Sequence, residues 1–593
     1  MSRSERRAVP GAHGRSHRSG SPCPPAGLPA DFTVVLDAGT RCVDAGRVLV
    51  GGTPLRLLRL GERGAALVGR WAAGDIVGDD PAARALARRL VDTGIAHPSP
   101  PRSAPAPEVT VVVPVRDQPD HLERLLASLV THPEGARRIV VVDDGSADPA
   151  AVATVCAAYA TSACPAPDRR PPHGAPGQCA SVETGSTTTS SRPEIDLVRL
   201  HRSSGPAAAR NHGAALTRSE VVVFLDADVE VAGGWLAPLV AHFADPEVGA
   251  VAPRVTCTVP AGRRGGLLAR YDAARSPLDL GARPAAVHRG GRVAFVPSAA
   301  LAVRRAALLD AEGFDPSLHV GEDVDLVWRL HAGGWSVRFE PTAGVTHASR
   351  STVRAWIRQR FRYGTSAAGL ARRHPGALAP VRAPWWSVAA WSAPAAWSAP
   401  AAWSAPAAWS APAAWSAPAA WQPVAARLSA ASTAALVAST AALVASTAAL
   451  VASTAALVDR LPIEDHRRLE ALRLAAQAHW HAGAGLADAL RRPWWPLAAV
   501  AAWRWPRARR VVAAAWLVPP CWGWLRDRPP VPILAWVMLH LVDDLAYGAG
   551  VWTGCLRHAT FGPLLPHLAG DRPPRWRSMG HGLRPPSADA RPR

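Results

Sequence analysis

A short run of apolar residues, VVVFL at 221–225, is followed at once by Asp226 and Asp228. A run of this length bounded by charge predicts a buried β-strand whose end presents two carboxylates. Carboxylate oxygens suit a divalent cation such as Mg²⁺ or Mn²⁺, which can in turn hold a diphosphate. A solvated acidic turn is the alternative, because Asp-x-Asp is a short and common pattern.

Predicted strands and helices alternate around this run. Such alternation indicates an α/β domain with a mixed, mostly parallel sheet and helices on both faces, which binds ligands at the carboxyl ends of its strands. The expected strands are residues 109–115, 138–146, 195–200, 221–229 and 248–255, and the expected helices are 120–130, 205–216 and 234–243. A strand and a helix are expected within 293–308, and another helix begins at Glu322 and Asp323. Capping of that helix is one explanation for the two carboxylates.

The composition narrows the class of protein without deciding its ligand. The 593 residues include 66 Lys+Arg against 46 Asp+Glu, for a net charge of +20, and none of the basic residues is lysine. This balance suits anionic substrates, nucleic acid or an anionic membrane surface. The eight cysteines include no C-x-x-C pair, which argues against a zinc ribbon or a disulfide scaffold and fits a reducing cytosol. The N-terminus lacks the apolar core of a secretory signal.

Residues 31–97 are expected to form a small module ahead of the sheet domain. Residues 1–29 are rich in Pro, Gly, Ser and Arg and are expected to be disordered. In the module, two or three strands precede helices expected at 54–60 and 81–94. This order resembles the PqqD-like winged-helix modules that grip precursor peptides of ribosomally made natural products. A structural cap on the next domain is the alternative, and a proline-rich linker at 98–107 follows.

The last third of the chain combines repeats with apolar helices. Residues 391–458 include five copies of WSAPAA and four of ASTAALV, and the uncharged part from 428 to 458 is long enough to span a bilayer. Residues 459–569 are expected to be helical, with apolar runs flanked by Arg and Trp, as is typical of a membrane interface. We interpret residues 161–193 as a surface insertion and 570–593 as a disordered tail.

Five segments resemble a known family. PVRDQPDHLERLLASL, VVDDGS, GPAAARNHG, FLDADV and GEDVDLVWRL follow one another within residues 108–365. In order and spacing they resemble the family 2 glycosyltransferases, which are inverting enzymes of the GT-A fold. The resemblance implies a nucleotide-sugar donor and a divalent metal, Mg²⁺ or Mn²⁺, on the Asp-x-Asp pair.

The resemblance also implies which residues bind the donor. Those facing the nucleotide would be Pro114, Arg116, Asp143, Asp144, Arg210 and Asn211. Among them, Asp144 would accept a hydrogen bond from the nucleobase. Asp226 would contact the ribose or the metal, Asp228 the metal, and His347, expected to end an edge strand, the metal or the diphosphate. A surface role for Asn211 and a structural role for His347 are the alternatives.

On the acceptor side, the resemblance implies a general base that takes the proton of the attacking hydroxyl. The family's base is the aspartate of a Glu-Asp pair, which is Asp323 beside Glu322. Because a metal and basic groups would offset the charge of the departing diphosphate, no general acid is required. Gln359, Arg362 and Tyr363 resemble the Q-x-x-R-W motif of processive synthases, with Tyr in place of Trp. The alternative is one face of a basic amphipathic helix.

RRPWWPLA, LVDDLAYGAGVWTGCLR and the N-terminal module together resemble the glycosyltransferases of mycofactocin gene clusters. The acceptor implied is the peptide-derived redox cofactor mycofactocin or its precursor, which would receive a β-linked glucose oligomer from UDP-glucose. Two rivals remain open: a transferase acting on a lipid or a cell-envelope polysaccharide, and a peptide- or membrane-binding scaffold with an inactive transferase domain. We expect a cytoplasmic enzyme that binds no nucleic acid, with a membrane surface, the inner face of the cell membrane, as a further partner.

Overall fold

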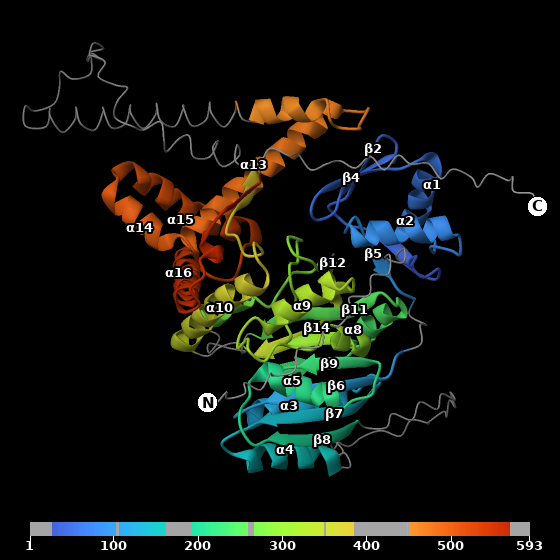
Figure 1. Cartoon of the computed structure of the whole chain (residues 1–593), viewed down its shortest axis with the longest axis vertical. Helices are drawn as coiled ribbons and strands as arrows, with labels where there is room; N and C mark the ends of the chain where they lie inside the picture. Colours follow the sequence, from blue (N-terminus) through green and yellow to red (C-terminus); the bar gives the residue numbers. More distant parts are fainter. Residues whose placement is uncertain are drawn as a thin grey trace, which may run out of the picture.

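The computed structural model describes residues 26–101, 106–161, 193–258, 266–348, 352–384, 448 and 450–569. Figure 1 shows three parts: a sheet domain at the bottom, an N-terminal module at the upper right in blue, and a group of C-terminal helices at the upper left in orange and red. The expected insertion, the WSAPAA repeats, most of the ASTAALV repeats and the expected C-terminal tail lie outside the described residues.

A nine-stranded mixed sheet forms the centre of the protein. Its main path runs β10-β14-β11-β13-β9-β6-β7-β8, and β12 pairs with β14. The parallel part contains β6 (Val109–Val115), β7 (Ala136–Asp144), β8 (Glu194–Leu200) and β9 (Val221–Leu225). The remaining strands are β10 (Val229–Val231), β11 (Val248–Thr258), β12 (Ala285–Ala286), β13 (Ala300–Arg304) and β14 (Ser336–Ala348). This architecture confirms the predicted fold class.

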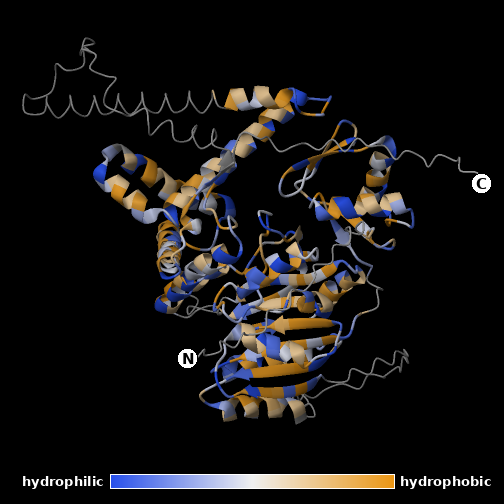
Figure 2. Cartoon of the chain, in the orientation of Figure 1, coloured by the Kyte–Doolittle hydropathy of each residue, from blue (hydrophilic) through white to orange (hydrophobic). Residues whose placement is uncertain are grey.

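Helices cover both faces of the sheet because its strands are apolar on both faces. Val111 and Val113 of β6 belong to one buried core, and Val112 between them belongs to the other. The apolar strands stand out in orange in Figure 2. The first core includes α3 (Pro119–Thr131), α4 (Pro149–Thr161) and α6 (Ala237–Ala241), which is followed by η1 (His242–Ala244). The second includes α5 (Pro206–Ala215), α8 (Arg305–Asp310) and α9 (Glu322–Ala332).

The N-terminal module contains two small sheets and two helices. In one sheet, β1 (Thr33–Leu36) pairs with β5 (Ala96–Ser99), and in the other β2 (Arg41–Val43), β3 (Val48–Gly51) and β4 (Arg56–Arg59) are antiparallel. The helices are α1 (Glu62–Ala72) and α2 (Pro81–Asp92).

Three expectations for this module were wrong in detail. Residues 54–60 are not a helix, because a seven-residue run is too short to be helical by itself and instead pairs with β3 as β4. Residues 26–29 are not disordered, since Leu28 is fully buried in the core of the module. Pro98 and Ser99 belong to β5 and not to a linker.

The module is docked against both other parts of the chain. The guanidinium of Arg88 forms an ion pair with the Asp245 carboxylate of the sheet domain, with an Nη2–Oδ1 distance of 2.6 Å, and both side chains are buried. On the opposite side, Val50 packs in one cluster with Leu461 and Ile463 from the C-terminal region. The module therefore contacts both the sheet domain and the C-terminal region, which lie far apart in the sequence.

The C-terminal helices join the sheet domain through α10 (Val353–Arg373), which packs against α16 (Ile533–Arg557). The helices α7 (Leu267–Ala274), α13 (Arg467–Arg491) and α15 (Pro506–Asp527) also pack on α16, and α14 (Trp495–Arg504) packs on α13 and α15. A short parallel pair, β15 (Arg382–Pro384) with β16 (His567–Ala569), and the turn η4 (Gly562–Leu564) complete this part. In the described chain α16 alone is long and apolar enough to cross a membrane, and 39% of its most apolar window is buried in the protein.

Candidate active site

A cavity of about 930 Å³ opens at the carboxyl ends of β6, β7 and β9. Its lining includes eleven of the residues proposed from the sequence: Pro114, Arg116, Asp144, Arg210, Asp226, Asp228, Glu322, Asp323, His347, Gln359 and Tyr363. These residues come from strand ends, from α5, α9 and α10, and from β14. The topology therefore brings segments that are more than 200 residues apart into one site.

Arg210 joins the first aspartate of the Asp-x-Asp pair to the Glu-Asp pair. Its Nη2 donates to Asp226 Oδ1 at 2.6 Å, and its Nη1 donates to Glu322 Oε1 at 2.9 Å. Burial would lower the pKa of Arg210, but the two carboxylates outweigh it and raise that pKa. A permanent positive charge therefore lies beside the strand end from which a diphosphate would be held.

Asp323 is the second residue of α9 and follows Glu322, and the residue before the helix is Gly321, whose φ of +88° favours glycine. Asp323 Oδ2 accepts a hydrogen bond from the Ser298 amide at 3.3 Å, and Oδ1 accepts one from the Val324 amide at 2.8 Å. Burial, with the nearby charge of Glu322, raises the pKa of Asp323 to about 7. The carboxylate both satisfies a backbone amide of the first turn and faces the cavity, so the capping and catalytic explanations are compatible.

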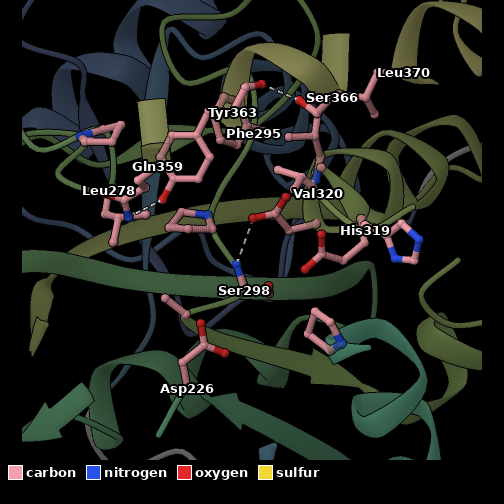
Figure 3. Close-up of a pocket in the computed structure, with 18 of the residues that line it drawn as sticks. Asp226, Leu278, Phe295, Ser298, His319, Val320, Gln359, Tyr363, Ser366 and Leu370 are labelled. Atoms are coloured by element: carbon pink, nitrogen blue, oxygen red, sulfur yellow. Dashed lines mark hydrogen bonds between the residues drawn. The ribbon is translucent and has the colours of Figure 1, made fainter. Parts of the chain in front are cut away.

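Figure 3 shows which labelled residues of the cavity lie on the two sides of Ser298. Asp226 lies on one side of Ser298, and Gln359, Tyr363 and Ser366 lie on the other. Gln359 Nε2 donates to the Tyr363 hydroxyl at 2.9 Å, which holds these two α10 side chains together. The base candidate thus stands between the Asp-x-Asp edge and α10.

Asp228 and His347 form the pair best suited to a metal ion. His347 Nε2 is 3.2 Å from Asp228 Oδ2, and both residues line the cavity. Burial would lower the pKa of His347, but its hydrogen bonds with Asp228 and Cys257 raise it to about 10. The expectation that His347 ends an edge strand was wrong, because β14 at this point pairs with β10 on one side and β11 on the other.

The donor set at this pair fits a divalent ion that the substrate helps to bind. Within the described ranges, no group of three His, Cys, Asp or Glu side chains is arranged to hold a metal by itself. Asp226, the third candidate ligand, is engaged by Arg210. Mg²⁺ and similar ions commonly take one or two protein carboxylates and fill their remaining positions with phosphate oxygens and water.

Three of the proposed residues do not line the cavity. Asp143 is buried and accepts a hydrogen bond from the Ser146 amide at 2.9 Å, so it supports the turn after β7. The Asn211 amide group bonds both the carbonyl and the amide of Phe314, at 2.7 and 2.8 Å, and so holds a loop in place. Arg362 points to solvent from α10. In this structure these three residues make structural or surface contacts outside the cavity lining, and their roles in donor or acceptor binding stay predictions.

Asp144, which was proposed from the sequence, lines the cavity, but its carboxylate already accepts hydrogen bonds from the amides of Ser204 and Gly205 at 2.7 and 2.9 Å.

Other polar residues line the cavity although the sequence offered little sign of them. The additional polar residues include Ser203, Arg275, Arg289, Ser298, His319, Arg360, Ser366, Arg492, Asp543 and Tyr547. Arg360 lies two positions before the proposed Arg362 and therefore on a different side of α10.

Comparisons with known proteins place the chain among glycosyltransferases. The model of "Glycosyl transferase family group 2" matches residues 221–457. The succinoglycan biosynthesis protein ExoU of Rhizobium meliloti is 27% identical over 247 residues, which cover 39% of this chain and 59% of that protein. A solved mannosyltransferase of Pyrobaculum calidifontis, in complex with GDP-Man and Mn²⁺, is 20% identical with a TM-score of 0.32 and covers 64% of this chain and 89% of its own.

The family match, which lies largely within the mixed sheet and its helices, shows that the chain contains a family 2 glycosyltransferase domain. A longer match then extends over nearly the whole chain. The pre-mycofactocin glycosyltransferase of Mycobacterium tuberculosis strain H37Rv is 35% identical over 550 residues, covering 91% of this chain and 98% of that protein. The chain belongs to the pre-mycofactocin glycosyltransferase family.

Proposed function

We propose that this protein transfers glucose from UDP-glucose, with inversion, onto a peptide-derived precursor of mycofactocin and builds a β-linked oligoglucoside. The observation that carries the proposal is the single cavity that joins the Asp-x-Asp edge to Asp323. The acceptor is proposed from the name of the relative that covers 91% of the chain.

The reaction follows from what these side chains can do. The acceptor hydroxyl gives its proton to the Asp323 carboxylate while its oxygen forms a bond to the anomeric carbon, and the bond from that carbon to the diphosphate breaks with its electron pair. A raised pKa makes Asp323 a stronger base than an ordinary aspartate. A divalent ion at the Asp-x-Asp edge would offset the negative charge left on the diphosphate, so no acid is needed there, while Arg210 holds the Asp226 and Glu322 carboxylates in place.

A divalent metal is part of the proposal. Asp228 and His347 would hold it, with Asp226 as a further ligand if Arg210 releases that carboxylate. When bound, such an ion neutralises charge on the two phosphates. The donor set, which is the carboxylates of Asp226 and Asp228 with the imidazole of His347, suits Mn²⁺ as well as Mg²⁺.

We also propose that the N-terminal module recruits the peptide-derived part of the acceptor. In the described part of the chain β4 pairs with β3 only, so its outer edge can accept an added strand. One face of this sheet packs on the C-terminal region, since Val48 and Val50 of β3 and Leu57 of β4 lie in one cluster with Leu461 and Ile463, so a peptide would add along the strand edge and not on this face. Truncating the precursor to its modified core should weaken its binding while leaving UDP binding unchanged, as measured by calorimetry.

A membrane surface as a partner stays a proposal with its own support. Exposed apolar side chains are concentrated on the α14–α15 hairpin, where Trp503, Trp505 and Trp522 are 79%, 56% and 53% exposed. Residues 495–527, which span this hairpin, contain five arginines and a single acidic residue, Asp527, which suits anionic lipid headgroups. This hairpin is also the observation that favours the rival hypothesis of a lipid acceptor.

One assay separates these hypotheses. Purified protein is incubated with UDP-glucose, Mn²⁺ and a mycofactocin precursor, and the products are read by mass spectrometry. Hexose-sized increments on the precursor support the proposal. Turnover only when a lipid acceptor is added supports the lipid rival, and failure to turn over any nucleotide sugar supports an inactive scaffold.

A further inference from the structure

The end of the cavity opposite the Asp-x-Asp edge is built by helices from outside the sheet domain. Arg492, which caps α13, and Asp543 and Tyr547 of α16 line the same cavity as Asp323. None of these three residues has a role in the donor site described above. The C-terminal helices therefore contribute side chains to the cavity that contains Asp323.

Close packing fixes the position of this end. A Cβ added at Gly364 of α10 would lie 2.1 Å from the carbonyl oxygen of Tyr547, and one at Gly550 of α16 would lie 2.0 Å from the carbonyl oxygen of Phe361. The two helices thus touch backbone to backbone, which only glycine permits. This contact sets Tyr547 beside the α10 turn that carries Tyr363.

The charges at this end are paired. Arg360 Nη2 is 2.6 Å from Asp272 Oδ1, and its Nε is 3.1 Å from Asp543 Oδ1. Arg492 Nε is 3.3 Å from Asp544 Oδ1, and its guanidinium stacks 4.1 Å from the centre of the Tyr547 ring. Asp544 is shared by Arg275, Arg491 and Arg492, and Arg491 also pairs with Asp488. With Arg360 between Asp272 and Asp543, four arginines therefore meet four carboxylates at this end, and this balance favours a neutral ligand with hydrogen-bonding groups over a phosphate.

We propose that Arg492 and Tyr547 are acceptor-binding residues for a neutral ring that bears hydroxyl groups, either a pyranose or a phenol. The Arg492 side chain is 37% exposed and can donate to a ring oxygen, while Tyr547 offers the edge or face of its own ring. A ring held there would approach Asp323 from the α10 side, opposite Asp226 (Figure 3). The inference rests on the proposed function, since it names the acceptor side of that same site.

The test is a binding measurement that needs no turnover. Cellobiose and 4-ethylphenol are titrated by calorimetry into the full chain saturated with UDP and Mn²⁺, using wild type, Arg492→Gln, Tyr547→Leu and Tyr547→Phe. Loss of one hydrogen bond or one ring contact corresponds to about a tenfold weaker binding. We expect that loss for Arg492→Gln and Tyr547→Leu, and we expect Tyr547→Phe, which keeps the ring, to bind the probe almost as wild type does.

Matched controls separate binding from folding. Arg468→Gln removes an exposed charge from α13, and Met538→Ala trims an exposed side chain of α16, and both should bind the probes as wild type does. UDP affinity should stay unchanged in every variant. Stronger binding of cellobiose identifies a sugar chain as the ligand and stronger binding of 4-ethylphenol an aromatic acceptor, and each result supports the inference.

Two results would overturn the inference: neither probe binding wild type at millimolar concentration, or Arg492→Gln and Tyr547→Leu binding as the controls do. A failure of the proposed function is distinguishable, because it shows as absence of UDP release from UDP-glucose by wild type whatever the probes do.

Discussion

Replacing Asp323 by asparagine should abolish transfer and at the same time stabilise the fold. The pKa of this carboxyl is raised from 3.8 to about 7, mainly by burial and then by Glu322. A shift of about three units corresponds to at most about 4 kcal/mol, since each unit is worth about 1.4 kcal/mol, and the partial exposure of the carboxylate reduces this figure. The ionised form is therefore disfavoured in the folded protein by on the order of 1–4 kcal/mol.

The sign of the pH dependence follows from linkage. Because the folded-state pKa is raised, Asp323 costs nothing below about pH 4, where it is protonated in both states, and its full cost is present above about pH 7. Asp323→Asn should consequently raise the unfolding midpoint at pH 8 and leave it nearly unchanged at pH 4, as scanning calorimetry can measure. Equal effects at the two pH values would refute the reasoning.

The same variant should lose activity, because a general base contributes about 10²–10⁴ in rate. In wild type, kcat/KM should rise with pH through about 7 and level off above it, as Asp323 loses its proton. The Asn variant should bind UDP-glucose with unchanged affinity in calorimetry. Near-normal turnover by this variant, or a rate that does not change between pH 6 and 8, would remove Asp323 as the base.

Three further changes test other parts of the account. Asp228→Ala should weaken UDP binding in the presence of Mn²⁺ by about tenfold or more and leave metal-free UDP binding unchanged, because it removes a ligand near His347. Arg88→Ala should destabilise the protein by about 3–5 kcal/mol in urea unfolding, because it leaves the buried Asp245 carboxylate without its partner. Gly550→Val should reduce transfer to the acceptor far more than UDP binding, because its side chain would collide with the backbone of α10 and displace α16 from the cavity.

The sheet domain was predictable because its strands are apolar on both faces, as is typical of strands buried in a parallel sheet. β9 is apolar throughout, β6 is apolar except at Thr110, and Asp226 directly after β9 marks the binding edge. Asp226, Asp228 and Asp323 could be placed in one site because each lies at an element end that the topology brings together.

The predicted residues that lie outside the cavity lining are held there by contacts that no local sequence pattern reveals. Asn211 bonds the backbone of Phe314, which is 103 residues away, so nothing near it in the chain marks it as structural. Arg360 and Arg362 both fit a basic helix, but two residues on a helix point in directions roughly 200° apart. The packing of α16 decides that Arg360 faces Asp543 and that Arg362 faces solvent.

The role of the C-terminal region could not be read from its composition. Apolar runs flanked by Arg and Trp predict an interface helix whether they pack on lipid or on protein. In α16 the adjacent residues Asp543 and Asp544 are buried and form ion pairs with arginines of neighbouring helices. These ion pairs hold α16 against the cavity. The α14–α15 hairpin retains the exposed apolar surface that the composition predicts.

The most direct test of the central claim is the configuration of the first glycosidic bond formed. A single base that activates the acceptor, facing a sugar diphosphate across one cavity, requires displacement with inversion. Proton NMR of the product made from UDP-glucose, whose glucose is α-linked, should therefore show a β-linked sugar in wild type and no product with Asp323→Asn. An α-linked product would contradict the account, because retention cannot arise from one direct attack assisted by Asp323.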